Sequence, residues 1–181
     1  WPYFQDVKIE RIHYHAKSGV LSQLITTTMH CTTHADSPAH VFEGGAFTDE
    51  IPLDSYFGTG VVVDIPKGKW GVVTAKDLEN ARPRIRKNDI VMINTGSHRN
   101  WGDNPDYFAY SPGLYKEAAE WIVARGVKLV GVDVQALDHP LGTKLADHGP
   151  GPSHWYLNDE YRELTGRNIA EDFPHWEPAH K

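Results

Sequence analysis

The 181-residue chain has 40% hydrophobic and 23% charged residues, which is typical of one globular domain with a sizeable core. Its net charge of -6 disfavours nucleic acid or an anionic membrane as a partner, and no apolar run approaches the ~20 residues that a bilayer span needs. A single cysteine excludes an intramolecular disulfide framework and favours a cytoplasmic protein. Eleven histidines point instead to metal or proton chemistry.

Short segments rich in β-branched and apolar residues predict strands at residues 21–29, 60–65, 89–95 and 127–133. Thr74 and Asp77 resemble a capping box and predict a short helix. A longer helix is expected to begin near Ser111 and Pro112 and to stop at Gly126. Its core-facing side would carry Leu114, Ala118, Trp121 and Ile122. Strands that alternate with helices predict the α/β class, with a mixed β-sheet and flanking helices.

Residues 134–181 show little periodicity and contain several prolines and glycines. Their many aromatic residues argue against disorder. We expect this segment to line a site or to contact a neighbouring subunit. The chain as a whole is predicted to form a single domain, residues 1–181, that is incomplete at both ends.

The most informative segment holds three histidines and one carboxylate at even positions: His30, His34, Asp36 and His40. In an extended strand His30 and Asp36 would lie ~20 Å apart, so they can share an ion only if the chain folds back, aided by Pro38. Two imidazoles and a carboxylate suit zinc, manganese or iron better than calcium or magnesium. Taken singly, each residue is better explained as a surface or core group. The four together are better explained as a metal site.

Three alternatives accompany this interpretation. Cys31 could be a thiolate ligand, but we expect a small buried hydrophobic residue because it alternates away from His30. His34 and Asp36, with the distant His98, match the pattern of a two-His-one-carboxylate iron oxygenase. A non-catalytic metal-binding protein is the third alternative.

The aspartates that end predicted strands, Asp64 and Asp133 among them, are interpreted as cap or turn residues rather than as supports for metal ligands.

The histidine segment resembles the signature H-x-G-T-H-x-D-x-P-x-H of the cyclase family, which includes bacterial kynurenine formamidase and isatin hydrolase. Thr32 stands where the family has glycine. The dipeptide Trp1-Pro2 and the tripeptide Gly131-Val-Asp133 also resemble family motifs, in the same order along the chain. The resemblance covers nearly the whole chain and implies the family's swivelling β/β/α-like fold.

The resemblance implies roles for individual residues. His30, His34 and Asp36 would bind a first metal ion, and Asp36 would bridge to a second. His40 would be the general acid/base, and Trp1 would contact the substrate. The family also uses a histidine later in its sequence, followed twelve residues on by a glutamate. His180 matches that histidine by its sequence context, and the glutamate would then lie beyond the chain. The alternative pair within the chain is His148 and Glu160, which have the same spacing.

These observations together predict a metal-dependent hydrolase of amide or cyclic amide bonds. Zinc or manganese would activate water, and His40 would move protons between the water and the departing nitrogen. The aromatic residues Trp1, Phe42, Phe47 and Trp101 could form the walls of a substrate pocket, although a place in the core is the more common role of such residues. We expect a small-molecule substrate (an amide, cyclic amide or lactone), a homo-oligomer, and a complementary C-terminal polypeptide.

Overall fold

The computed structural model describes residues 5–102, 104–142 and 158–173. The chain divides into two compact units, Trp1–Ser37 and Pro38–Lys181. Within those described ranges, no helix has the length and apolar character to cross a membrane.

The described part of the first unit contains a β-hairpin, followed by an irregular segment over residues 27–37. Strand β1 (Lys8–His13) pairs antiparallel with β2 (Ser22–Thr26), and the one-turn helix α1 (His15–Ser18) lies between them. Gly19 ends α1 with φ 71°, a left-handed conformation that glycine adopts without steric cost. The strand predicted over residues 21–29 therefore forms but ends earlier, at Thr26, and the histidine segment begins within a turn a few residues later.

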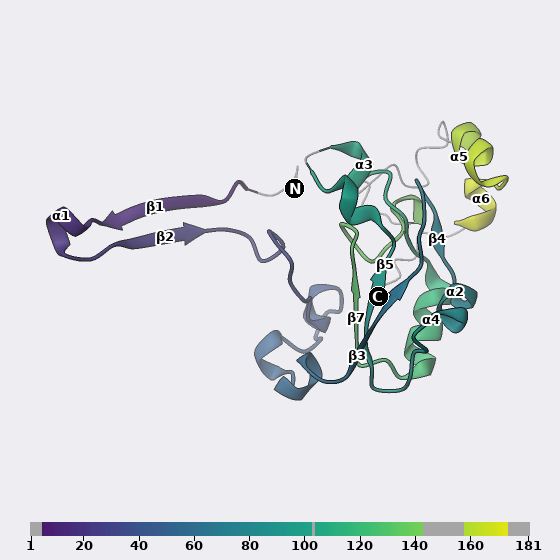
Figure 1. Ribbon diagram of the computed structural model, residues 1–181, viewed down its shortest axis with the longest axis horizontal. Helices are drawn as coiled ribbons and strands as arrows, with labels where there is room; N and C mark the ends of the chain where they lie inside the picture. The colour runs from purple at the N-terminus through teal and green to yellow at the C-terminus, as the bar shows by residue number, and fades with distance from the viewer. Residues whose placement is uncertain (1–4, 103, 143–157, 174–181) are drawn as a thin grey trace. The chain divides into compact units, whose positions relative to one another are not determined.

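The second unit is built around a parallel sheet in the order β3-β5-β7 (Figure 1). Its strands fall inside three of the predicted segments: β3 (Gly60–Asp64), β5 (Ile90–Asn94) and β7 (Leu129–Val132). Both pairs in this sheet are parallel, and the antiparallel pairing occurs separately, in the hairpin of the first unit. The predicted α/β class is confirmed.

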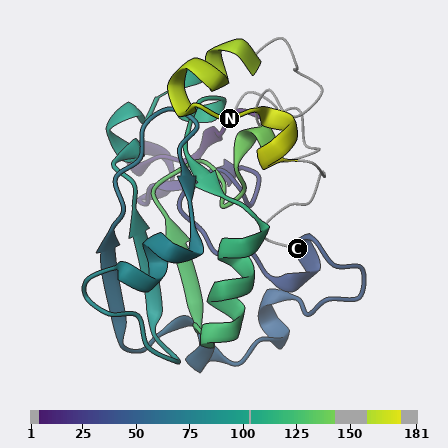
Figure 2. The same ribbon diagram turned by 90° about the vertical axis from the view of Figure 1, so that its right-hand side faces the viewer.

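Helices α2 (Ala75–Asn80) and α4 (Lys116–Arg125) cover one face of this sheet, as the two views in Figures 1 and 2 show. Alternate strand residues point toward them, because successive side chains in a strand face opposite sides. The resulting apolar core includes Val63, Val91, Ile93, Leu78, Ala118 and Ile122. Full burial of each large side chain stabilises the fold by about 1.5–3 kcal/mol.

The start of α2 is the predicted capping box. The Asp77 backbone N–H donates to Thr74 Oγ1 over 3.1 Å, and the Thr74 backbone N–H donates to Asp77 Oδ2 over 2.8 Å. The predicted start of α4 near Ser111 is wrong, because the helix begins at Lys116 after an extended Tyr115. Strand β6 (Gly113–Leu114) takes the preceding residues into a parallel pair with β4 (Val72–Val73). The predicted end at Gly126 is confirmed.

The remaining described elements are short. The one-turn helices are η1 (Pro38–His40), η2 (Thr48–Glu50), η3 (Leu53–Tyr56), η4 (Ser97–Asn100), α3 (Pro105–Phe108) and η5 (Pro140–Gly142). Two helices, α5 (Asn158–Thr165) and α6 (Ile169–Asp172), lie in the segment for which no periodicity was found. They bury Tyr161 and Ile169 in a second apolar cluster with Trp70, Leu141 and Phe173.

A buried histidine in this unit makes stability depend on pH. His139 is 1% exposed, its Nε2 lies 2.9 Å from the Trp70 carbonyl oxygen, and its Nδ1 accepts from the Leu141 backbone N–H. Burial lowers the pKa of His139 to about 4, from an ordinary value of 6.5. Between these values the unfolded chain binds a proton that the folded chain excludes, so the stabilisation present above pH 6.5 is lost as the pH falls toward 4.

We therefore expect His139 to lower the free energy of unfolding by about 3 kcal/mol between pH 7 and pH 4. Urea unfolding at several pH values measures this loss. The control variant His139→Gln keeps a donor for Trp70 and an acceptor for Leu141 but does not titrate, and it should show a shallower pH dependence. Identical pH dependence in the two proteins would contradict the assignment.

Candidate metal centre

The segment after β2 folds back on itself, which is the condition for His30 and Asp36 to share one metal ion. The Cys31 backbone N–H donates to the Thr28 carbonyl oxygen over 3.3 Å, which closes a turn that contains His30. Cys31 itself is exposed, so the prediction that it is buried is wrong. That prediction assumed strand alternation through Cys31, whereas β2 has already ended at Thr26.

His30, His34 and Asp36 bring three potential ligand atoms together. His30 Nδ1 lies 2.8 Å from His34 Nε2 and 3.3 Å from Asp36 Oδ1, and His34 Nε2 lies 3.2 Å from the same oxygen. Ligand atoms about 2.05 Å from a tetrahedral zinc ion lie about 3.3 Å apart. Atoms on one face of an octahedral ion at about 2.1 Å lie about 3.0 Å apart. This triangle of atoms therefore fits one divalent ion of either geometry.

The backbone fixes the orientation of the His34 ring. His34 Nδ1 forms a short hydrogen bond with the carbonyl oxygen of Thr32, which can only accept. Nδ1 must therefore carry the proton, and in the neutral imidazole the lone pair is on Nε2, the atom in the triangle. A carbonyl behind a metal-ligating histidine is a common arrangement that orients the ring. Sequence reasoning missed this contact because a backbone carbonyl leaves no signal in the sequence.

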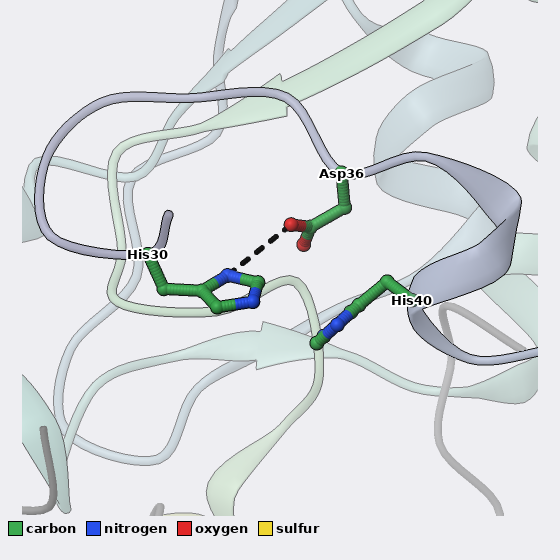
Figure 3. A group of neighbouring side chains, drawn as sticks. All are labelled: His30, Asp36 and His40. Atoms are coloured by element: carbon green, nitrogen blue, oxygen red, sulfur yellow. Dashed lines mark ion pairs between the residues drawn. The ribbon is translucent and has the colours of Figure 1, made fainter. Parts of the chain in front are cut away.

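His40 faces the same place from the following turn. One ligand atom from each of His30, Asp36 and His40 lies within 4.8 Å of the others, and Figure 3 shows the three side chains converging. His40 is exposed and ends η1. The turn that carries it is packed against Gly45, where a Cβ would lie 2.7 Å from the Pro38 carbonyl carbon. A side chain at position 45 would therefore displace η1.

Several predicted site residues are placed elsewhere or not described. Trp1, His148 and His180 lie outside the described residues. Glu160, the alternative later ligand, forms an ion pair with Lys69 Nζ, whose distance to Oε1 is 2.7 Å. The aromatic side chains expected in the core are exposed instead: Phe42 by 46%, Phe47 by 65% and Trp101 by 78%.

Asp133 organises the turn after β5 in the second unit. Its Oδ1 accepts from the backbone N–H and the hydroxyl of Thr95, and its Oδ2 accepts from the backbone N–H of Gly96. The ring Nδ1 of His98 donates a hydrogen bond to Oδ2 over 2.9 Å, so this nitrogen is already engaged by the carboxylate. Burial raises the pKa of Asp133, but the hydrogen bonds from His98 and Thr95 outweigh it and lower the pKa to about 2. The predicted turn role of Asp133 is confirmed.

We expect Asp133→Asn to lower the free energy of unfolding at pH 7 by about 1–3 kcal/mol, because the amide NH₂ must face hydrogen-bond donors whichever way it turns. Urea unfolding measures the loss. Asp64→Asn is the matched control. Asp64 ends β3, which lies next to β5, and it is exposed and accepts one side-chain hydrogen bond from Asn94. Equal effects of the two substitutions would contradict the assigned role.

Comparison with known proteins connects this geometry to a family. A family model described as "Putative cyclase" matches residues 1–139. Kynurenine formamidase of Erythrobacter litoralis (strain HTCC2594) is 32% identical over 152 residues, which are 83% of this chain and 63% of the relative. Kynurenine formamidase of Bacillus mycoides (strain KBAB4) is 29% identical over 125 residues, 68% of this chain and 56% of the relative. The chain thus spans less than two thirds of these curated relatives.

Solved structures share the fold. Isatin hydrolase A from Labrenzia aggregata, bound to benzyl benzoate, matches with a TM-score of 0.67 and 23% identity, over 87% of this chain and 68% of that one. Isatin hydrolase A from Ralstonia solanacearum matches with a TM-score of 0.67 and 24% identity, over 85% of this chain and 65% of that one. At this level of identity the likeness establishes the fold.

Proposed function

This chain belongs to the cyclase family, and on that premise we propose that the protein is a metal-dependent hydrolase of amide or cyclic amide bonds. The observation that carries the proposal is the triangle of His30 Nδ1, His34 Nε2 and Asp36 Oδ1. The names of its relatives support the reaction class, since kynurenine formamidase and isatin hydrolase both denote hydrolysis of a carbon–nitrogen bond.

The donor set supports zinc or manganese as the metal, because it combines neutral nitrogens with one anionic oxygen. When bound, such an ion lowers the pKa of a water molecule and polarises a carbonyl group. Thr32 holds the His34 ring so that Nε2 faces inward, and Asp36 supplies the negative charge that balances a cation. A second ion, with Asp36 as the bridge and His180 as a ligand, is part of the proposal.

His40 is proposed as the group that moves protons. Imidazole both accepts and donates protons near neutral pH, so one ring can take a proton from the attacking water and return it to the departing nitrogen. The position of His40, within 4.8 Å of ligand atoms of His30 and Asp36, supports this role. Trp1 is proposed to contact the substrate, a small amide, cyclic amide or lactone.

The proposal extends to the whole protein. Because the chain spans 63% and 56% of two kynurenine formamidases, we propose that activity requires chain beyond these 181 residues, covalently attached or added as a separate C-terminal polypeptide. The family resemblance is the basis for expecting one cyclase-like domain. Exposed Ile9, Ile12, Leu24 and Ile25 on the hairpin support a homo-oligomer, and the single, free Cys31 supports a reducing, cytoplasmic location.

One experiment tests the reaction class. The full-length protein is purified, its metal is measured, and N-formyl aromatic amines and isatin-like lactams are assayed before and after treatment with EDTA. Hydrolysis that disappears with EDTA and returns with zinc or manganese is expected. Oxygen uptake that requires iron and 2-oxoglutarate, or metal binding without any hydrolysis, would contradict the proposal and favour an oxygenase or a non-catalytic metal protein.

A further inference from the structure

A cavity that is largely open to solvent lies in the second unit and is bordered mainly by the long side chains of cationic residues. Its volume is about 330 Å³, and it is bordered by Arg84, Ile85, Arg86, Lys87 and Arg125. A second cavity of about 340 Å³ shares Lys87 and Arg125 and adds Trp121 and Ala124. No carboxylate among the described residues borders either cavity. This concentration of positive charge occurs in a chain whose net charge is -6.

The cations of the first cavity lack acidic partners. Lys67 and Lys69, elsewhere in the unit, form ion pairs with Asp77 and Glu160 at 2.8 Å and 2.7 Å. By contrast, no ion pair within the described ranges involves the four cations of the cavity: Arg84, Arg86, Lys87 and Arg125. The Nε of Arg125 is in addition buried without a hydrogen-bond partner, although its guanidinium also lies 5.2 Å from the centre of the Trp121 ring. Buried donors of this kind are normally satisfied by a partner.

The backbone around the cavity is held in place by other groups. Ile85 is 2% exposed and anchors the loop in the core between the two exposed arginines. The backbone N–H of Arg86 donates to Asp89 Oδ2 over 2.7 Å, and the backbone N–H of Asn88 donates to the Gly126 carbonyl over 2.8 Å. These bonds fix the loop against the end of α4. A ligand would therefore not have to order the loop backbone, although the exposed side chains of Arg84, Arg86 and Lys87 would still have to close on it.

The position of the cavity separates it from the usual active-site edge of this fold class. The loop of residues 84–87 precedes β5, and Arg125 is the last residue of α4, before β7 (Figure 1). The cavity therefore lies at the amino ends of the parallel strands, whereas ligands of open α/β sheets usually bind at the carboxyl ends. The C-terminal end of α4 carries about half a negative charge from the helix dipole, which disfavours an anion here. The four positive charges of the side chains outweigh it.

We propose that this cavity binds a small phosphate-bearing anion, at a site independent of the histidine cluster. Guanidinium groups bind phosphate oxygens through charge-assisted, bidentate hydrogen bonds, and the lysine adds a further charge. Such a site would give the protein a second ligand, whose binding does not need the metal.

Calorimetric titration of the protein with inorganic pyrophosphate at 150 mM NaCl tests the proposal. Saturable binding of one pyrophosphate per chain is expected, and the double variant Arg84→Gln/Arg86→Gln should weaken it by about tenfold or more. Both side chains are exposed, so the fold should tolerate the change. Arg99→Gln is the matched control: it removes the same charge from an exposed arginine in the turn after β5, at the opposite edge of the sheet, and should leave binding unchanged.

Pyrophosphate also binds divalent metals, so the titration is repeated with EDTA-treated and metal-loaded protein. Equal affinity in the two forms is expected. Binding that requires the metal would place the anion at the histidine cluster and overturn the proposal. The absence of saturable binding, or equal binding by the double variant, would overturn it as well, because the attraction would then be absent or due to general charge. None of these results depends on the hydrolase activity.

Discussion

The His40→Asn variant is expected to retain its metal and to lose turnover by about 10²–10⁴-fold, the usual effect of removing a general acid/base. The triangle of His30, His34 and Asp36 does not include His40, so the ion should keep all three of these ligands. Asparagine preserves hydrogen bonding at the position but cannot carry a proton between water and the leaving nitrogen. Parallel measurement of kcat and of metal per chain in the full-length protein separates the two effects.

His15→Asn is the matched control for this substitution, because His15 is an exposed histidine in α1 and has no assigned role. It should leave both metal content and turnover unchanged. If His40→Asn loses its metal together with its activity, His40 is a ligand and the assigned division of roles is wrong. The 4.8 Å grouping of His30, Asp36 and His40 makes that alternative geometrically accessible.

His34→Ala is expected to abolish metal binding. It removes one corner of the triangle and the ring that Thr32 orients, and two remaining ligands hold an ion far less tightly than three. Elemental analysis after dialysis against metal-free buffer should find no bound metal. His34 is exposed and its segment contributes no residue to the buried clusters, so the substitution should leave the thermal unfolding of the metal-free protein unchanged. Full metal content in the variant would refute the site.

Local signals in the sequence predicted the parts of the fold that depend on neighbouring residues. The capping box of Thr74 and Asp77 and the left-handed end of α4 at Gly126 are such cases, because each is completed within a few residues. The start of α4 depends instead on long-range pairing: the Leu114 backbone N–H donates to the Leu137 carbonyl, which holds residues 113–114 extended. The spacing of apolar residues in the sequence does not show that residues 113–114 pair with distant residues instead of starting the helix.

The same distinction holds for the candidate site. Two histidines and a carboxylate within seven residues, together with the family resemblance, led to the prediction that His30, His34 and Asp36 would converge, provided that the chain folds back between them. The environment of Asp133 was predicted only as a turn role, since its contacts with Thr95 and His98 join segments more than 30 residues apart. Helix α5 was missed because few of its residues are apolar, and α6 was missed because it is only four residues long.

X-ray absorption at the metal edge tests the metal site most directly, because it reports the ligand atoms around the bound ion. With zinc bound, the account predicts nitrogen and oxygen scatterers at about 2.0–2.1 Å, with the pattern of two imidazole rings, and no sulfur. The His34→Ala variant should lose this signal. A sulfur shell at about 2.3 Å, which the exposed Cys31 could supply, or a shell without imidazole would contradict the assignment of His30, His34 and Asp36 as the metal ligands.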